Sequence, residues 1–144
     1  MAGFNVEFPS EIISSINKVM YNSEEMFGEM TKAGAEVVYK SVKSNMKSSF
    51  KSTKSLDKGL KITRTYSTIS DDGINTKVGF YGYDEDGVPI PLKAMAREYG
   101  TSRGEKKKPF FRKAFNQKSA ITTAMLNVQK RYIDEWLWIT KKHI

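Results

Sequence analysis

The sequence predicts an α+β fold: a long N-terminal helix, a small antiparallel sheet built on a hairpin, and a long C-terminal helix packed on that sheet. Apolar residues recur every three or four positions in the first third of the chain and again after residue 109, but every second position between residues 60 and 80. With 144 residues, 39% of them hydrophobic and 12% aromatic, the chain is expected to fold as a single domain over 1–144.

The first segment, residues 10–47, is expected to be helical. Ser10 follows a proline and precedes Glu11, a pattern typical of a helix start, because a serine oxygen accepts first-turn N–H groups and a carboxylate favours the positive helix end. Asn22 with Glu25 offers a second cap, which leaves open one kinked helix or two. Beyond Lys40 serines and lysines interleave and apolar residues thin out, so we interpret residues 48–58 as a mobile basic loop rather than a ridge that follows phosphates.

Residues 59–99 are expected to be mainly strands. Alternating apolar residues on both sides of Asp72-Gly73 indicate an antiparallel hairpin, since this dipeptide favours a tight turn. The acidic turn Asp84-Glu85-Asp86-Gly87 fits a solvated turn better than a calcium loop, because Val88 and the absence of a later glutamate break the ligand pattern. Pro89 and Pro91 predict an edge strand or an extended loop, and residues 92–99 fit either a strand or a short helix.

The last element, residues 109–142, is expected to be a long helix that begins at Pro109, because proline suits the first helical position. Near its end four consecutive apolar residues point all the way round the helix. Two interpretations are equally favoured: these residues form an interface with another subunit, or they are buried in the chain's own core. These candidate interface residues are Trp136, Leu137, Trp138 and Ile139.

The residue inventory excludes most catalytic chemistry. The chain has no cysteine, and its only histidine, His143, is the penultimate residue. Thiolate catalysis, a Ser-His-Asp triad and zinc sites are therefore excluded, and no pair of carboxylates stands out. We predict no enzymatic activity, no cofactor and no metal. No apolar run approaches the ~18 residues of a membrane span, and no secretory signal is recognisable, so we expect no membrane contact and assembly in the cytoplasm.

The net charge of +8 is divided into blocks along the chain. Acidic residues outnumber basic ones in residues 1–30, by five to one, and in residues 66–100, by six to three. Basic residues outnumber acidic ones in residues 31–65, by nine to two, and in residues 101–144, by eleven to three. Such segregation fits complementary surfaces on neighbouring copies, and it also fits contacts with nucleic acid. The densest positive cluster supplies the candidate basic contacts, which are Lys106, Lys107, Lys108, Arg112 and Lys113.

Four short sequence phrases follow one another in a familiar order. They are Val42-Lys43-Ser44-Asn45; then Gly59-Leu60; then Glu98-Tyr99-Gly100-Thr101; and finally Pro109-Phe110 with Ala114 shortly after. Over about residues 30–116 the order and spacing resemble the neck or tail-completion proteins, minor tail components of tailed bacteriophages. The chain departs from that pattern in lacking a proline near Asn45, and the resemblance does not explain its Trp-rich end.

The resemblance implies a non-enzymatic structural protein of the virion, located at the head-to-tail junction. There the subunit would belong to a ring, hexameric within the neck, that joins the tail tube or tail terminator to the head connector and contacts DNA in its lumen non-specifically. From the residues alone, Glu98 to Thr101 fit the end of an element followed by a glycine turn that aims the final helix. The alternative is a small basic cytosolic nucleic-acid-binding protein.

Overall fold

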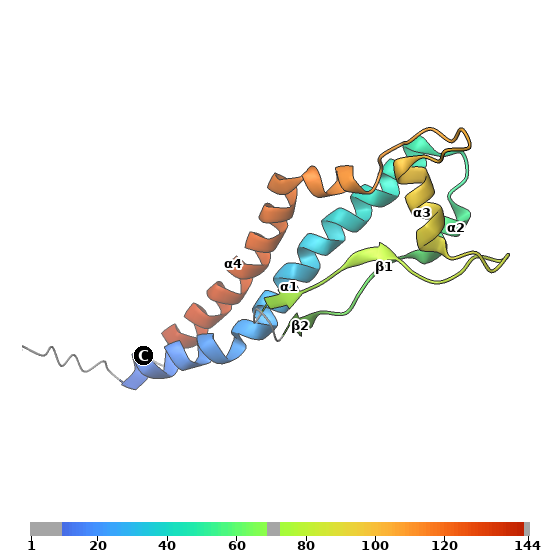
Figure 1. Cartoon of the computed structure of the whole chain (residues 1–144). Helices are drawn as coiled ribbons and strands as arrows, with labels where there is room; N and C mark the ends of the chain where they lie inside the picture. Colours follow the sequence, from blue (N-terminus) through green and yellow to red (C-terminus); the bar gives the residue numbers. More distant parts are fainter. Residues whose placement is uncertain (1–9, 69–72, 143–144) are drawn as a thin grey trace, which may run out of the picture.

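The computed structural model describes residues 10–68 and 73–142, without the side chains of residues 11–22, 54, 68 and 138–142, and confirms the α+β fold (Figure 1). The elements in chain order are α1 (Ser10–Ser49), α2 (Lys54–Gly59), β1 (Leu60–Ile62), β2 (Tyr66–Thr68), β3 (Gly73–Asn75), β4 (Val78–Phe80), α3 (Ile90–Tyr99), the 3-10 helix η1 (Arg112–Asn116) and α4 (Lys118–Lys142).

The first helix, α1, is contacted by α4, η1 and the strands β1, β3 and β4. α1 is continuous, and α4 packs along it rather than mainly on the sheet, where the sequence placed it (Figure 1). Polar contacts tie the two helices together: the Tyr132 hydroxyl donates to Glu25 at 3.4 Å, and Arg131 forms an ion pair with Glu29. The second cap foreseen at Asn22 therefore does not divide the helix.

The predicted hairpin is present as two short antiparallel ladders. β1 pairs with β4, Leu60 opposite Phe80, and β2 pairs with β3, Tyr66 opposite Asn75. The sheet contacts α1, where the Thr31 hydroxyl lies 2.9 Å from that of Thr76. Asp72 of the foreseen tight turn lies outside the described residues.

The core is centred where the sequence suggested a solvated loop. Val42 and Met46 on α1 are fully buried, and Phe50 and Leu56 are nearly so. The expected loop over 48–58 is therefore wrong for much of its length, because α1 continues to Ser49 and residues 54–59 form α2. The few apolar residues among the serines and lysines are the ones that pack inward.

Residues 90–99 are helical, which corrects the expectation of mainly strands up to residue 99. Ile90, Ala94 and Glu98 are its buried residues, and their four-residue spacing places them on one helix face. Pro91 stands in the first turn, where its missing N–H costs nothing. Pro89 does lie in an extended bridge, opposite Tyr83.

The last helix begins at Lys118, not at Pro109. Residues 109–111 are outside any helix, and the chain then makes one 3-10 segment, η1, before α4 starts. The interruption lies at Gln117, whose backbone at φ −80° and ψ 54° is not helical and separates η1 from α4. Phe110 is fully buried in the core.

Candidate functional site

The Glu98 carboxylate, at the end of α3, joins two distant parts of the chain. Its Oε2 accepts the backbone N–H of Phe110 at 2.9 Å and that of Phe111 at 3.0 Å. Its Oε1 accepts the backbone N–H of Arg112 at 3.2 Å and the Nε–H of the same residue at 3.0 Å. One buried carboxylate thus receives four hydrogen bonds, three of them from consecutive backbone groups, so it determines the path of residues 110–112.

These bonds change the ionisation of Glu98. Burial by itself raises the pKa of a carboxyl group, because it disfavours the charged form. Here the N–H groups of Phe111 and Phe110 and both donors of Arg112 outweigh burial, and the pKa of Glu98 lies below its usual value of 4.5. The group is therefore an ionised acceptor at neutral pH and has no proton to give.

Phe110 is held from its other side by Asn45. The Asn45 Nδ2–H donates to the Phe110 carbonyl at 3.0 Å, and the Phe110 ring is fully buried. The ring makes edge contacts with Phe50 and Phe80, with centroids 5.2 and 5.9 Å away. We call the set of Asn45, Glu98, Phe110, Phe111 and Arg112 the Phe110 junction.

Two glycines are required by this arrangement. Gly100 has φ +76° and ψ 175°, a conformation almost restricted to glycine, and a Cβ there would lie 2.7 Å from the Glu105 oxygen. Gly59 has no room for a side chain either, since a Cβ would lie 2.5 Å from Cγ2 of Ile90. Close backbone packing explains both glycines without any chemistry.

The structure therefore brings together the phrases on which the resemblance rests. Val42, Leu60, Phe110 and Ala114 are core residues, and Glu98 and Asn45 hold the backbone of Phe110. The remaining residues lie at the edge of the junction. Tyr99 is 56% exposed beneath the Arg112 guanidinium, Thr101 is exposed, and Pro109 is half-buried.

The sequence did not identify how Glu98 and Asn45 act. The available signal was the four-residue spacing of Ile90, Ala94 and Glu98, which on a helix places the carboxylate on an apolar face, where it needs donors nearby. Asn45 has no comparable signal, because its partner lies 65 residues away in the chain.

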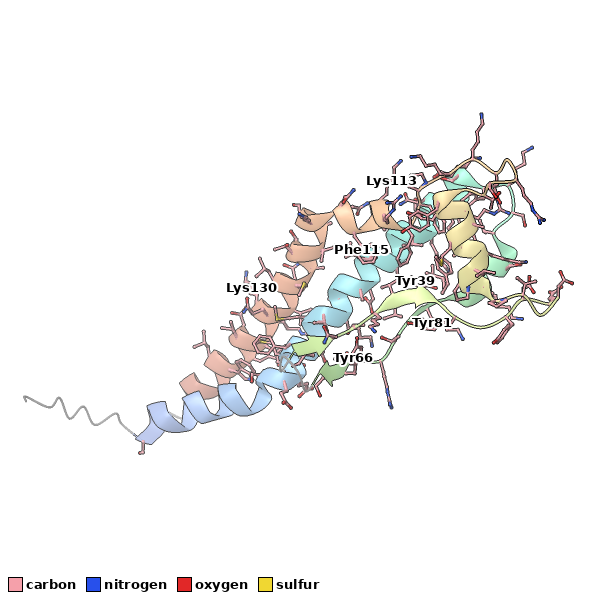
Figure 2. All side chains as sticks on the ribbon, viewed as in Figure 1. Tyr39, Tyr66, Tyr81, Lys113, Phe115 and Lys130 are labelled. Carbon is pink, nitrogen blue, oxygen red and sulfur yellow. The ribbon has the colours of Figure 1, made fainter. Side chains whose placement is uncertain are left out.

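The two basic stretches foreseen in the sequence meet at one end of the molecule. The loop after α3 folds over the end of α1, where the Lys108 ammonium donates to the Ser49 carbonyl at 3.3 Å. No helix begins at Pro109, so Lys106 to Lys108 do not stand before a positive helix end. Lys108 instead lies at the negative end of α1, where a cation is favoured. Exposed lysines are close in sequence to both partners of this contact: Lys47 and Lys51 flank Ser49, and Lys106 and Lys107 precede Lys108. Exposed Lys113 lies at the same end of the molecule (Figure 2).

An apolar groove of about 320 Å³ opens beside the Phe110 junction. Arg112, whose side chain is 58% exposed, stands at this groove. The apolar and aromatic side chains that line it are Phe80, Pro91, Ala94, Met95, Tyr99 and Phe111. Because Glu98 holds the backbone of Phe111 and Arg112, this wall of the groove is fixed by the junction.

The Trp-rich end of α4 is only partly described. Trp136 is half-buried, with its ring 5.8 Å from that of Tyr132, and Leu137 is 54% exposed. The side chains of Trp138 and Ile139 lie outside the described part of the structure. The interface foreseen for these four residues stays a prediction.

Within residues 10–68 and 73–142 no three His, Asp or Glu side chains gather as a metal-ligand set. No described helix is long and apolar enough to cross a bilayer. The chain was compared with protein-family models, with curated proteins and with solved structures, and no match was found. A functional proposal therefore rests on the geometry of this molecule and on the resemblance of its sequence phrases to the tail-completion family.

Proposed function

We propose that this chain is a non-enzymatic structural subunit of a tailed-phage virion, a neck or tail-completion protein that joins the tail to the head connector as part of a ring. One observation carries the proposal: the phrases that resemble that family meet around Phe110. Glu98 of one phrase binds the backbone of another, and Asn45 of a third binds the same residue. Residues far apart in the sequence thus form one structural unit.

The proposed role needs a rigid body and no catalysis. Glu98 is ionised and fully engaged, so the junction is a buried brace that fixes the end of α3 relative to α1 and η1. Buried polar networks of this kind give a fold one defined shape when every member is paired. A subunit that must fit neighbours in a ring requires such a defined surface.

The test is electron microscopy of particles assembled without this protein. We expect filled heads and detached tails, and rescue by the wild-type chain supplied from a plasmid. Glu98→Ala should rescue poorly because it breaks the junction. Glu105→Ala, which removes an exposed carboxylate 3.5 Å from Arg97, should rescue normally. Intact, infectious particles made without the protein would refute the proposal.

A second candidate function, nucleic-acid binding, is favoured by the meeting of the two basic stretches at Lys108 and Ser49. It predicts duplex binding whose log-log salt dependence has a slope of about −0.9 per phosphate contacted. Lys106→Ala with Lys107→Ala should make that slope shallower by about 1.8, the amount expected for two lost phosphate contacts. Lys130→Ala, an exposed lysine on the distant face of α4, should leave it unchanged (Figure 2). Absence of binding at low salt would reject this function.

A further inference from the structure

Exposed apolar side chains are concentrated in one part of the surface. Eleven large apolar residues are exposed in the described part of the chain, and six of them lie between residues 81 and 99. Isolated exposed apolar residues are normal on any protein, but a contiguous group next to a groove marks a contact surface. The six are Tyr81, Tyr83, Val88, Leu92, Met95 and Tyr99.

Part of this surface is a projecting loop, residues 82–88, which we call the acidic loop. It extends from the start of α3 away from the body of the molecule (Figure 1). Tyr83 is 65% exposed at its base, and Glu85 and Asp86 are exposed at its tip. An aromatic ring and two carboxylates are thus presented together.

The acidic loop contains the exposed turn expected from the sequence at Glu85 to Gly87, but its first acidic residue is buried and holds the loop. Asp84 is buried, and its Oδ1 accepts the N–H groups of Asp86 and Val88 at 2.9 and 2.8 Å. Its other oxygen forms an ion pair with Lys93 of α3. The bond from Lys93 and those two N–H groups hold the pKa of Asp84 below its usual value despite burial. A loop fixed in this way loses little entropy on binding.

The groove beside the Phe110 junction has complementary properties. Its lining is mostly apolar, which suits an aromatic side chain. Arg112 stands at the same place with its side chain 58% exposed, although its charge is partly balanced by Glu98, which pairs with it and also lines the groove. The loop that follows α3 carries further exposed positive charge at Arg103, Lys106 and Lys107. The acidic loop carries the opposite charge, and such pairing orients two surfaces as they meet.

We propose that the acidic loop of one copy docks in the apolar groove of a second copy of this chain, with Tyr83 against the groove lining and Glu85 and Asp86 facing Arg112. Loop and groove are different surfaces, so the contact is heterologous and can be repeated from copy to copy until a ring closes. The inference rests on the proposed function, because it names the contact that would build the ring.

Because the chain contains no cysteine, single cysteines report this contact cleanly. Val88→Cys labels the acidic loop and Met95→Cys labels the groove, and both side chains are exposed, at 38% and 58%. The two variants, one of them tagged, are mixed and treated with a short bismaleimide. Since each chain has one thiol, a tagged–untagged crosslink forms only between copies. The control is Val88→Cys mixed with Leu126→Cys, whose α4 side chain is 51% exposed.

We expect the Val88→Cys and Met95→Cys mixture to give at least about fivefold more heterodimer than the control pair, and Glu85→Lys with Asp86→Lys to abolish the difference. Light scattering on the wild-type chain should show assemblies that the same charge reversal dissociates. Equal crosslinking in both mixtures, or a monomer at every concentration, would overturn the docking. Assemblies that form without the expected crosslink would also overturn it, but they would leave the ring itself standing. Particle microscopy tests the proposed function separately.

Discussion

Removing the Glu98 carboxylate is the most direct perturbation of this molecule. In Glu98→Ala the N–H groups of Phe110, Phe111 and Arg112 lose their acceptor, and the N–H of Phe110 is buried. A buried donor left unpaired costs about 1–3 kcal/mol. With one buried donor and two half-buried ones that water can partly reach, we expect the free energy of unfolding to fall by about 2–5 kcal/mol.

Glu98→Gln should be milder. The amide oxygen can still accept from Phe110 and Phe111, but the NH₂ group then faces the backbone N–H and the Nε–H of Arg112, which are donors and cannot accept from it. We expect a loss of about 1.5–3 kcal/mol. The assay is urea unfolding followed by circular dichroism, with Glu105→Ala as the control that should lose less than about 1 kcal/mol, since exposed ion pairs contribute little.

The pH dependence provides an independent check on the same group. The folded-state pKa of Glu98 is depressed, so its contribution to stability is present above its usual pKa of 4.5. That contribution is lost as the pH falls through the folded-state pKa. The stability difference between wild type and Glu98→Gln should therefore shrink in acid. A Glu98→Ala protein within about 0.5 kcal/mol of wild type at pH 7 would show that the four bonds do not hold the chain together.

Three further predictions concern single side chains. Gly100→Ala should cost about 2 kcal/mol or more in urea unfolding, because strain adds to a backbone clash, whereas Gly104→Ala, also at positive φ but with open space around it, should cost less. Gly59→Ala should cost about 1–3 kcal/mol by overpacking Ile90, and Gly59→Ala with Ile90→Val should recover part of that loss, while full stability of Gly59→Ala alone would contradict the close approach. Burial and the nearby Glu29 and Glu25 carboxylates raise the pKa of Tyr132 to about 12. Its contribution to folding stability is therefore complete below about pH 10 and is lost as the pH rises toward 12. The tyrosinate absorbance of Tyr132→Phe should lack the late titration step, and titration curves identical to wild type would exclude the raised pKa.

The two functional proposals make different demands on the same end of the molecule. A ring subunit uses Arg112 and its neighbours to attract the acidic loop of another copy, whereas a nucleic-acid-binding protein uses the exposed lysines to attract phosphates. Both uses are compatible with one surface, because Arg112 stands at the groove and Lys106 and Lys107 belong to the loop beside it. Salt weakens both contacts, so variants rather than ionic strength separate them.

Much of the fold could be predicted where local physics decides. The helix from Ser10 and the alternation around the hairpin follow from side-chain periodicity, and the structure contains both. Prediction failed where a few apolar residues outweighed their neighbours. Phe50 and Leu56 are surrounded by serine and lysine in the sequence, so composition indicated a loop, yet burying these two side chains places the segment in the core.

The sequence by itself determined that the chemistry of cysteine thiolates is closed to this chain, because the absence of cysteine depends on no fold. It also singled out Glu98, Gly100 and Phe110 as members of two short phrases. Only the tertiary structure decided that these phrases meet. Pro109 has the local properties of a helix start, but Glu98 and Asn45 reach the backbone of Phe110 from 12 and 65 residues away. Bonds between residues so far apart are invisible to local propensity, and so is the non-helical backbone of Gln117, after which the last helix starts at Lys118.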